Sequence, residues 1–152
     1  MVNGDSMEVR EIEFSELSKV LSLYDEFDRP PVPWPSQEQQ QNIYRALIDS
    51  GGHILVAVFD NSIVGTCTLN LCQNFSWSGR PYAIIENVIV TQKFRNKGAG
   101  KALLNHAVKL AENKNCYKVA LMTSSKELST LKFYEAAGFS GDKQGFQRRF
   151  DS

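Results

Sequence analysis

The apolar residues of this chain recur with two different spacings, which predict an alternation of strands and helices. Alternating or continuous apolar runs rich in β-branched residues are typical of strands, whereas apolar residues three or four apart indicate helices. Strands are expected at residues 7–13, 53–59, 62–71, 82–90, 117–122 and 146–150. Helices are expected after Ser15, after Ser36, from Gly98 to about residue 111, and at 126–137. This order predicts an α/β fold with a mixed sheet.

Turn-forming residues separate these elements. Four prolines between residues 30 and 35 forbid both helix and central strand, so the first helix must end before them. The Asp60-Asn61 pair is expected to join two strands into a hairpin. Gly138 is the expected left-handed residue after the last helix, and Phe139 is expected to make the hydrophobic contact that follows it.

Residues 84–110 hold the clearest candidate for chemistry. A predicted strand leads into a basic R-x-x-G-x-G loop at residues 95–100, and Gly98 and Gly100 open an amphipathic helix. A helix N-terminus offers unpaired N–H groups and favours negative charge, and glycines let a ligand approach the backbone closely. Four basic side chains surround the loop: Lys93, Arg95, Lys97 and Lys101. These features predict a phosphate or pyrophosphate site.

The loop departs from two common phosphate-binding motifs. A Walker P-loop needs glycine at position 95 and serine or threonine at position 102, where the chain has Arg95 and Ala102. The dinucleotide fingerprint needs glycine or alanine at position 103, which is Leu103. A glycine loop alone is also compatible with a purely structural role, but its place between a strand and a helix favours an anion site.

The composition indicates one folded domain over residues 1–152. The 152 residues are 42% hydrophobic and 11% aromatic, enough to build a core. No apolar run approaches the roughly 20 residues of a membrane helix, and the first residues show no signal-peptide pattern. We therefore expect a cytoplasmic protein without a membrane partner, and residues 1–6 are expected to be a disordered leader.

The titratable residues narrow the function classes further. Two histidines and three cysteines without C-x-x-C spacing argue for reduced thiols and against a metal site. Residues 91–118 hold seven basic side chains and one acidic one, a balance that can indicate nucleic-acid binding. Because this segment coincides with the glycine loop and no nucleic-acid-reading motif is present, a small phosphate ligand is the better interpretation.

Three motifs together resemble a known family. IENVIV at 85–90, RNKGAG at 95–100 and FYEAAGF at 133–139 are similar to the GNAT acyltransferase superfamily. The resemblance implies a GNAT-like mixed, mostly antiparallel sheet of six or seven strands flanked by about four helices. It also implies transfer of acetyl from acetyl-CoA to a primary amine, by direct attack in a ternary complex. IENVIV together with NCYKVAL at 115–121 looks like the glucosamine-6-phosphate N-acetyltransferase branch.

The resemblance also assigns residues to acetyl-CoA. The main chain of the fourth strand should pair with the pantetheine arm at Val88, Ile89 and Val90. The pyrophosphate should bind the loop amides of Arg95, Asn96, Lys97, Gly98, Ala99, Gly100 and Lys101. Many members carry asparagine early in the last helix, where this chain has Glu127. Ser129 or Thr130 is the candidate replacement for that cofactor contact.

Two residues are candidate catalytic groups by the same resemblance. Glu86 matches a general base, and a carboxylate inside an apolar strand is costly unless it has a partner. A structural hydrogen-bonding role for Glu86 is the alternative. Tyr134 matches the residue that protonates the departing sulfur, and its alternative is a core aromatic on a helix.

The acceptor side is expected to come from the acidic N-terminal half of the chain. Trp34 and Asn87 are the candidate substrate-binding residues, although the proline segment around Trp34 also reads as a stiff linker. The acids Asp25, Glu26 and Asp28 precede Trp34, and such a rim favours a small cationic amine over a sugar phosphate.

Other partners and roles stay open at this point. The alternative acceptors are protein or peptide amines. The alternative to an enzyme is a non-catalytic CoA-binding regulator. A homodimer is expected by resemblance, with Phe75, Trp77 and the last strand as candidate interface elements.

Overall fold

The computed structural model describes residues 7–26 and 32–150. The chain divides into two compact units, Met1–Leu121 and Met122–Ser152, and each is treated by itself. The predicted leader at residues 1–6 and the predicted rim residue Asp28 lie outside the described residues. That the two units form one domain over 1–152 stays a prediction.

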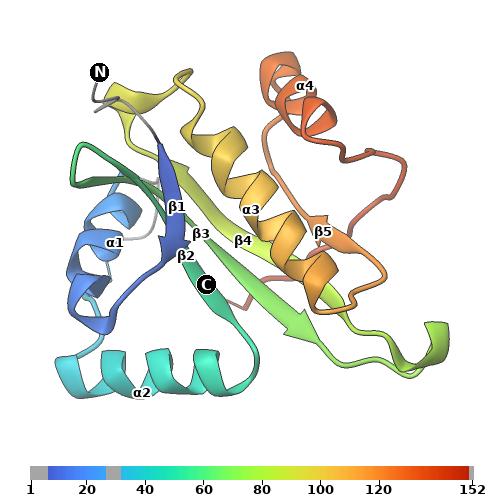
Figure 1. The fold of residues 1–152 in the computed structure, drawn as a ribbon, viewed down its shortest axis with the longest axis horizontal. Coiled ribbons are helices and arrows are strands. Elements are labelled where there is room, and N and C mark those ends of the chain that lie inside the picture. The colour runs from blue at the N-terminus through green and yellow to red at the C-terminus, as the bar shows by residue number, and fades with distance from the viewer. Residues whose placement is uncertain (1–6, 27–31, 151–152) are drawn as a thin grey trace. The chain divides into compact units, whose positions relative to one another are not determined.

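The first unit is built on a five-stranded sheet in the order β1-β2-β3-β4-β5 (Figure 1). The strands are β1 Glu8–Glu11, β2 His53–Phe59, β3 Ser62–Cys72, β4 Tyr82–Val90 and β5 Val119–Leu121. The first four strands run antiparallel to their neighbours, and β5 runs parallel to β4. The mixed, mostly antiparallel sheet is confirmed, but it has five strands rather than six or seven.

Four α-helices accompany the strands in the described residues. They are α1 Leu17–Tyr24, α2 Gln37–Asp49, α3 Ala99–Asn113 and α4 Leu128–Ala136, of which α4 belongs to the second unit. Short 3₁₀ turns at Phe14–Glu16, Trp77–Gly79 and Gln92–Phe94 complete the list. The predicted cap of α2 is confirmed, because Ser36 Oγ accepts from Gln39 N–H and the Gln39 side chain accepts from Ser36 N–H.

Helix α3 covers one face of the sheet, and Figure 1 shows it lying across the strands. A Cβ placed on Gly65 of β3 would lie 3.1 Å from Leu103 Cδ1, so glycine at this position lets the helix approach closely. The helix residues that are fully or almost fully buried are Ala99, Leu103, Leu104, Ala107 and Ala111.

Helix α1 covers the opposite face. Side chains alternate along β3, so Thr66 and Thr68 point away from the face that Gly65 presents to α3. Their partners on β2, Val56 and Ile54, pack in one cluster with Val20 of α1. On this face Thr68 also pairs with Glu86 of β4, a candidate catalytic residue.

The predicted last strand at residues 146–150 is wrong. These residues form no strand or helix, and Phe146 and Phe150 are 87% and 88% exposed. A strand needs a neighbour for its backbone groups, and the pairings in the described part of the chain include none for this segment. Phe146 and Phe150 would share one face of an extended chain, but the polar residues 147–149 lie between them and no described strand pairs with the segment.

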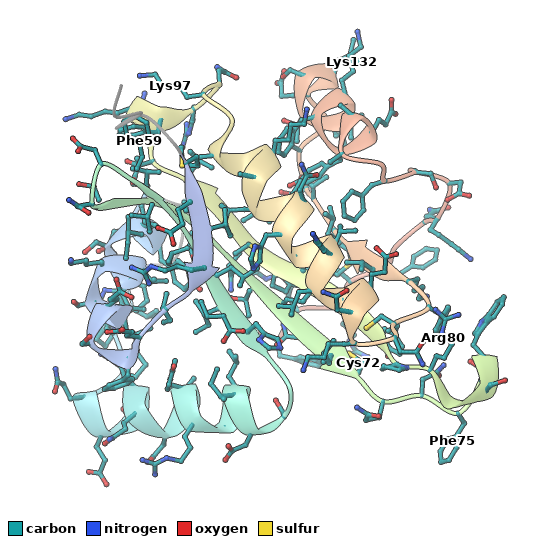
Figure 2. All side chains as sticks on the ribbon, in the orientation of Figure 1. Phe59, Cys72, Phe75, Arg80, Lys97 and Lys132 are labelled. Carbon is teal, nitrogen blue, oxygen red and sulfur yellow. The ribbon has the colours of Figure 1, made fainter. Side chains whose placement is uncertain are left out.

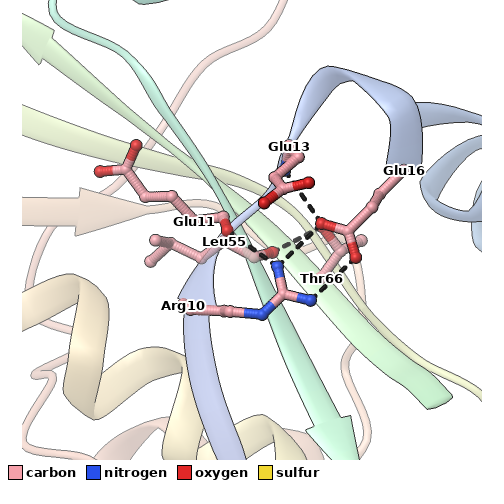
Figure 3. A network of polar contacts seen from close by, with 6 residues as sticks. All are labelled: Arg10, Glu11, Glu13, Glu16, Leu55 and Thr66. Carbon is pink, nitrogen blue, oxygen red and sulfur yellow. Dashed lines mark hydrogen bonds and ion pairs between the residues drawn. The ribbon is translucent and has the colours of Figure 1, made fainter. Parts of the chain in front are cut away.

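The start of the first helix also differs from the prediction. Ser15 is not its cap; it lies inside the 3₁₀ turn Phe14–Glu16, and α1 begins one residue after that turn. Glu16 Oε1 accepts from Glu13 N–H at 2.9 Å, and its carboxylate receives two 2.8 Å bonds from Arg10 of β1 (Figure 3). This two-bond ion pair joins β1 to the entry of α1.

The Arg10–Glu16 pair should make stability depend on acid pH. The hydrogen bonding with Arg10, followed by the bond from the Glu13 backbone, lowers the pKa of Glu16 from 4.5 to about 2. The folded pKa lies below the unfolded one, so the stabilisation is complete above pH 4.5 and is lost as the pH falls toward 2. We expect Glu16→Gln to lower the unfolding free energy at pH 7 by about 0.5–1 kcal/mol.

The measurement is urea unfolding at pH 7 and near pH 3. The difference in unfolding free energy between wild type and Glu16→Gln should be smaller at the lower pH. Glu8→Gln is the matched control, because Glu8 is an exposed carboxylate of β1 that acts on Arg10 only through its charge. An equal difference in unfolding free energy at both pH values would show that the charge of the Glu16 carboxylate does not cause the destabilisation.

Candidate functional site

Strand β4 contains a bulge at its centre. Thr68 of β3 pairs with Glu86, and Thr66 of β3 pairs with Ile89. The two pairs are two residues apart on β3 but three residues apart on β4, so β4 holds one extra residue, which is a β-bulge. Asn87 lies in this bulge with a φ of +55°. Because cross-strand partners share a face, Glu86 lies on the face of Thr68, which α1 covers.

At its other edge, β4 loses its pairing with β5 just before the bulge. The pairing with β5 covers only Ala83, Ile84 and Ile85, opposite Val119, Ala120 and Leu121. From Glu86 onward, β4 therefore has no ladder to β5. Backbone groups that leave a ladder need other partners, and an extended ligand can provide them.

The strand then leads to the start of α3. Gly98 is the N-cap, with φ +90° and ψ 0°, and no side chain caps the helix. Ala102 N–H makes the first intrahelical bond to the Gly98 carbonyl at 3.0 Å. Helix geometry leaves the N–H groups of the preceding turn without intrahelical acceptors. Among the described residues, no atom beyond the neighbouring turn lies within 4 Å of where a Cβ on Gly98 would stand, so these residues leave the space beside this turn open.

The basic side chains of the loop differ in how they are held. Arg95 Nε donates to the Val90 carbonyl at 3.2 Å, and Lys97 Nζ lies 5.3 Å from the centre of the Phe94 ring. Lys93 and Lys101 are exposed. The loop thus carries positive charge next to the uncapped helix start, the arrangement that binds phosphate groups.

Three contacts fix the segment between β4 and the glycines. The rings of Phe59 and Phe94 lie 5.3 Å apart, and Figure 2 shows Phe59 and Lys97 at the same end of the sheet. Thr91 N–H donates to the Val64 carbonyl at 2.8 Å. Gln92 N–H donates to Glu26 Oε1 at 3.2 Å, so a carboxylate just after α1 caps the 3₁₀ turn Gln92–Phe94.

A second group of side chains meets on the α1 face of the bulge. The Tyr24 ring lies 6.2 Å from the Trp34 ring, centre to centre. Burial raises the pKa of Tyr24, and the polar side chains of Thr68 and Asn87 nearby lower it by less, so the phenol stays neutral at pH 7.

Tyr134 and Ser129 belong to the second unit, on α4. Gly138 N–H donates to the Glu135 carbonyl at 3.0 Å and Phe139 N–H to the Tyr134 carbonyl at 3.1 Å, which is a Schellman motif. The Phe139 ring packs edge-on against Tyr134 at 6.4 Å, so the predicted helix end is confirmed. Burial raises the pKa of Tyr134, which keeps its hydroxyl protonated near neutral pH. Ser129 is exposed in the first turn of α4.

Comparison with known proteins now decides the family. The Acetyltransferase (GNAT) family matches residues 20–139. The chain belongs to the GNAT acetyltransferase family. It is therefore an acyltransferase, as the three sequence motifs predicted.

Relatives and solved structures that resemble this GNAT acetyltransferase are themselves named as acetyltransferases. It is 34% identical over 150 residues, 95% of each chain, to glucosamine 6-phosphate N-acetyltransferase of Trypanosoma brucei brucei. A putative acetyltransferase from Agrobacterium tumefaciens is 34% identical, with a TM-score of 0.86 and 94% and 99% of the two chains covered. Glucosamine-6-phosphate N-acetyltransferase from Arabidopsis thaliana shares the fold at 22% identity, with a TM-score of 0.84 and coverage of 97% and 100%.

The first unit of this GNAT acetyltransferase contains most of the predicted site residues. Residues 86–90 form the bulged part of β4, and Arg95–Lys101 form the loop that opens α3. Glu86 is exposed, so its carboxylate avoids the cost of burial that an apolar strand would otherwise impose. The Val90 carbonyl, expected to serve the pantetheine arm, already accepts from Arg95.

Several contacts were not found from the sequence. No local pattern in the sequence reports that Tyr24 lies near Thr68 and Asn87, 44 and 63 positions away. The same holds for the bond between Glu26 and Gln92, 66 positions apart. The described residues contain no group of three or more histidine, cysteine or acidic side chains placed to hold a metal. They also include no helix long and apolar enough to cross a membrane.

Proposed function

We propose that this GNAT acetyltransferase uses acetyl-CoA to acetylate the primary amine of an amino sugar, by direct attack in a ternary complex. One observation carries the proposal. Strand β4 bulges at Asn87, loses its ladder to β5 after Ile85, and leads to the uncapped start of α3. One short segment thus combines a stretch of β4 without a ladder to β5, the proposed anion site and the exposed carboxylate of Glu86.

The residues of the first unit fit acetyl-CoA. The amides at the start of α3 and the side chains of Lys93, Lys97 and Lys101 would hold its phosphates, and residues 88–90 of β4 would hold its pantetheine arm. The open space beside Gly98 supports this fit, because no protein side chain fills it. Acetyl-CoA supplies the acetyl group as a reactive thioester.

Two side chains have the properties that amine acetylation requires. An ammonium group must lose a proton before it can attack, and the Glu86 carboxylate is the proposed base, acting directly or through water. Glu86 is exposed on the α1 face, where an acceptor can reach it. Tyr134 is the proposed donor of the proton that the leaving sulfur needs. Its raised pKa keeps that proton in place at neutral pH.

An amino sugar fits the α1 face better than a polyamine. The acidic rim is weaker than the sequence suggested, because Glu26 caps the Gln92–Phe94 turn. The neighbouring rings of Tyr24 and Trp34 and the amide of Asn87 suit a hydroxylated ring. The name of the Trypanosoma brucei brucei relative also points to glucosamine 6-phosphate. However, Arg80 Nε and Nη2 already donate to the carbonyls of Asn115 and Cys116, which leaves fewer of its donors for a sugar phosphate.

The test is a thiol-release screen of the full chain with acetyl-CoA. The acceptors are glucosamine 6-phosphate, glucosamine, spermidine and lysine-containing peptides. Turnover of either amino sugar well above the other amines supports the proposal. Acetylation confined to peptides or spermidine contradicts the acceptor class. Coenzyme A binding without turnover of any amine would instead indicate a regulator, and binding of duplex DNA with no response to coenzyme A would contradict the whole site.

Replacing Tyr134 tests the leaving-group role. We expect Tyr134→Phe to lower kcat by about 10- to 100-fold, because the departing sulfur loses its proton donor. The KM for acetyl-CoA should change little, since the ring and its packing on Phe139 remain. Tyr117→Phe is the control, because the Tyr117 ring stacks on Trp77 outside the proposed site. Full activity of Tyr134→Phe would assign Tyr134 to packing.

The predicted homodimer and cytoplasmic location stay predictions. The loop between β3 and β4 presents Phe75 fully exposed and Trp77 65% exposed, although the Trp77 ring stacks on Tyr117 at 5.3 Å. Figure 2 shows Phe75 pointing away from the sheet. A monomer in light scattering at micromolar concentration would contradict the dimer.

A further inference from the structure

A carboxylate at the end of α1 holds the start of the turn that leads from β4 to the phosphate loop. The N-cap of the 3₁₀ turn Gln92–Phe94 is Thr91, which makes no side-chain cap. A free N–H at the start of a helical turn needs an acceptor. Glu26 Oε1 supplies it, 3.2 Å from the Gln92 nitrogen. A residue just after α1 thus completes the turn by which the chain leaves the sheet.

Glu26 stands where its charge does not help its own helix. It follows the C-terminal end of α1, where the helix dipole disfavours a negative charge. Its backbone is held in place, because Glu26 N–H donates to the carbonyl of the buried Leu23 at 3.0 Å. The favourable partner of the carboxylate lies instead on the cofactor side, at the Gln92 amide.

The turn sets the direction of the loop that follows it. The Phe94 ring lies 5.3 Å from the Phe59 ring, and Arg95 Nε donates to the Val90 carbonyl at 3.2 Å. Only five residues separate the capped N–H from Gly98, the N-cap of α3. Because the connection is this short and is bonded back to the sheet, the position of the turn restricts where the loop amides lie.

We propose that Glu26 is a positioning residue for acetyl-CoA, whose carboxylate caps the Gln92–Phe94 turn and so holds the amides of residues 95–101 where the phosphates bind. The inference rests on the proposed function, in which that loop binds coenzyme A. Glu26 acts through the turn and takes no part in the chemistry itself. It belongs to the cofactor side of the site rather than to the acidic rim that the sequence indicated.

The charge of Glu26 and its hydrogen bond act in opposite directions on phosphate binding. A negative carboxylate near the loop opposes the phosphates, whereas the hydrogen bond keeps the loop ready for them. Glutamine keeps an oxygen that can accept from the Gln92 N–H but carries no charge. Alanine removes both the charge and the acceptor. Comparison of Glu26→Gln with Glu26→Ala therefore separates the two effects.

Proline at position 92 removes the other partner of the hydrogen bond. Thr91 has φ −58° and ψ 144°, the conformation favoured before proline, and the first position of a helical turn tolerates proline. Gln92→Pro leaves no N–H for Glu26 to accept. Glu26→Ala should therefore have no further effect in this background, whatever the proline does by itself. Gln92→Ala keeps the N–H and controls for the loss of the side chain.

Two measurements on the full chain test the proposal: calorimetric titration with coenzyme A, and hydrogen exchange of the backbone amides of residues 92–101. We expect Glu26→Ala to raise the Kd for coenzyme A by roughly five- to tenfold, as for the loss of one hydrogen bond to a charged group, and to speed exchange in the loop. Glu26→Gln should stay within about twofold of wild type in Kd, because its amide oxygen restores the cap.

Kinetics with an amino sugar complete the comparison. At saturating acetyl-CoA, kcat should change by less than about twofold in Glu26→Ala, whereas the KM for acetyl-CoA should rise with the Kd. Glu112→Ala is the matched control, because Glu112 is an exposed carboxylate near the C-terminal end of α3. This control should match wild type in all three measurements.

Other outcomes overturn the proposal. Faster exchange with an unchanged Kd in Glu26→Ala would show a structural role only, and an unchanged rate would show that the cap does not hold the loop. Tighter coenzyme A binding in both Glu26→Ala and Glu26→Gln would show that charge outweighs the cap. A raised KM for the amine alone would return Glu26 to the acceptor rim. If wild type binds no coenzyme A, the proposed function fails, while the exchange measurement still decides whether Glu26 holds the turn.

Discussion

Gly98→Val should abolish coenzyme A binding in a protein that still folds. Gly98 has a φ of +90°, which a β-branched residue adopts only under strain. In the part of the chain that the structure describes, nothing beyond the neighbouring turn lies within 4 Å of the position of a Cβ, so the valine side chain enters the space beside the amides of α3. Phosphate binding at those amides needs that space. We expect an affinity loss of at least about 100-fold, equivalent to about 2.7 kcal/mol.

Calorimetric titration with coenzyme A measures this loss, and circular dichroism reports the fold. Gly79→Val is the matched control, because Gly79 also has a positive φ of +78° and an open surrounding, but lies in the loop after β3. The control should show comparable strain and normal coenzyme A affinity. Unchanged affinity in folded Gly98→Val would contradict the assignment of this loop to the phosphates.

Glu86→Gln is expected to lower kcat/KM by about 10²–10⁴-fold, the range for loss of a positioned base. Glutamine keeps the size of the side chain and its place at the bulge, but it cannot take a proton. The acidic limb of the pH dependence of kcat/KM should therefore disappear, while coenzyme A affinity is kept.

The pH profile of acetyl transfer measures both effects. Glu112→Gln is the control, since Glu112 is an exposed carboxylate of α3 away from the bulge. A limb that persists in Glu86→Gln would point to another base. Normal activity with an unchanged profile would leave Glu86 with the structural role that the sequence had also allowed.

Features that depend on neighbouring residues could be predicted from the sequence. The Asp60-Asn61 hairpin turn, the Ser36 cap and the end of α4 at Gly138 each follow from side chains within a few positions of each other. The strand–loop–helix at 82–113 was predictable for the same reason, because the β-branched run, the glycines and the helical spacing are all local signals.

The arrangement of the candidate site could not be predicted in the same way. The bulge at Asn87 moves Glu86 and Ile89, three positions apart, to one face, and strict alternation would separate them. The bond between Glu26 and Gln92 joins positions 66 residues apart, and the contact between the Phe59 and Phe94 rings joins positions 35 apart. The failed strand at 146–150 has the same origin, since a strand is defined by a distant partner as much as by its own pattern.

The tether between Arg95 and the Val90 carbonyl bears on the thermodynamics of cofactor binding. Ordering a free arginine side chain costs up to about 2 kcal/mol of conformational entropy. In this protein that cost, together with the ordering of the turn by Glu26 and Phe59, is already met when the chain folds. The proposed anion site is therefore preorganised, and phosphate binding there is expected to use more of its electrostatic attraction as affinity.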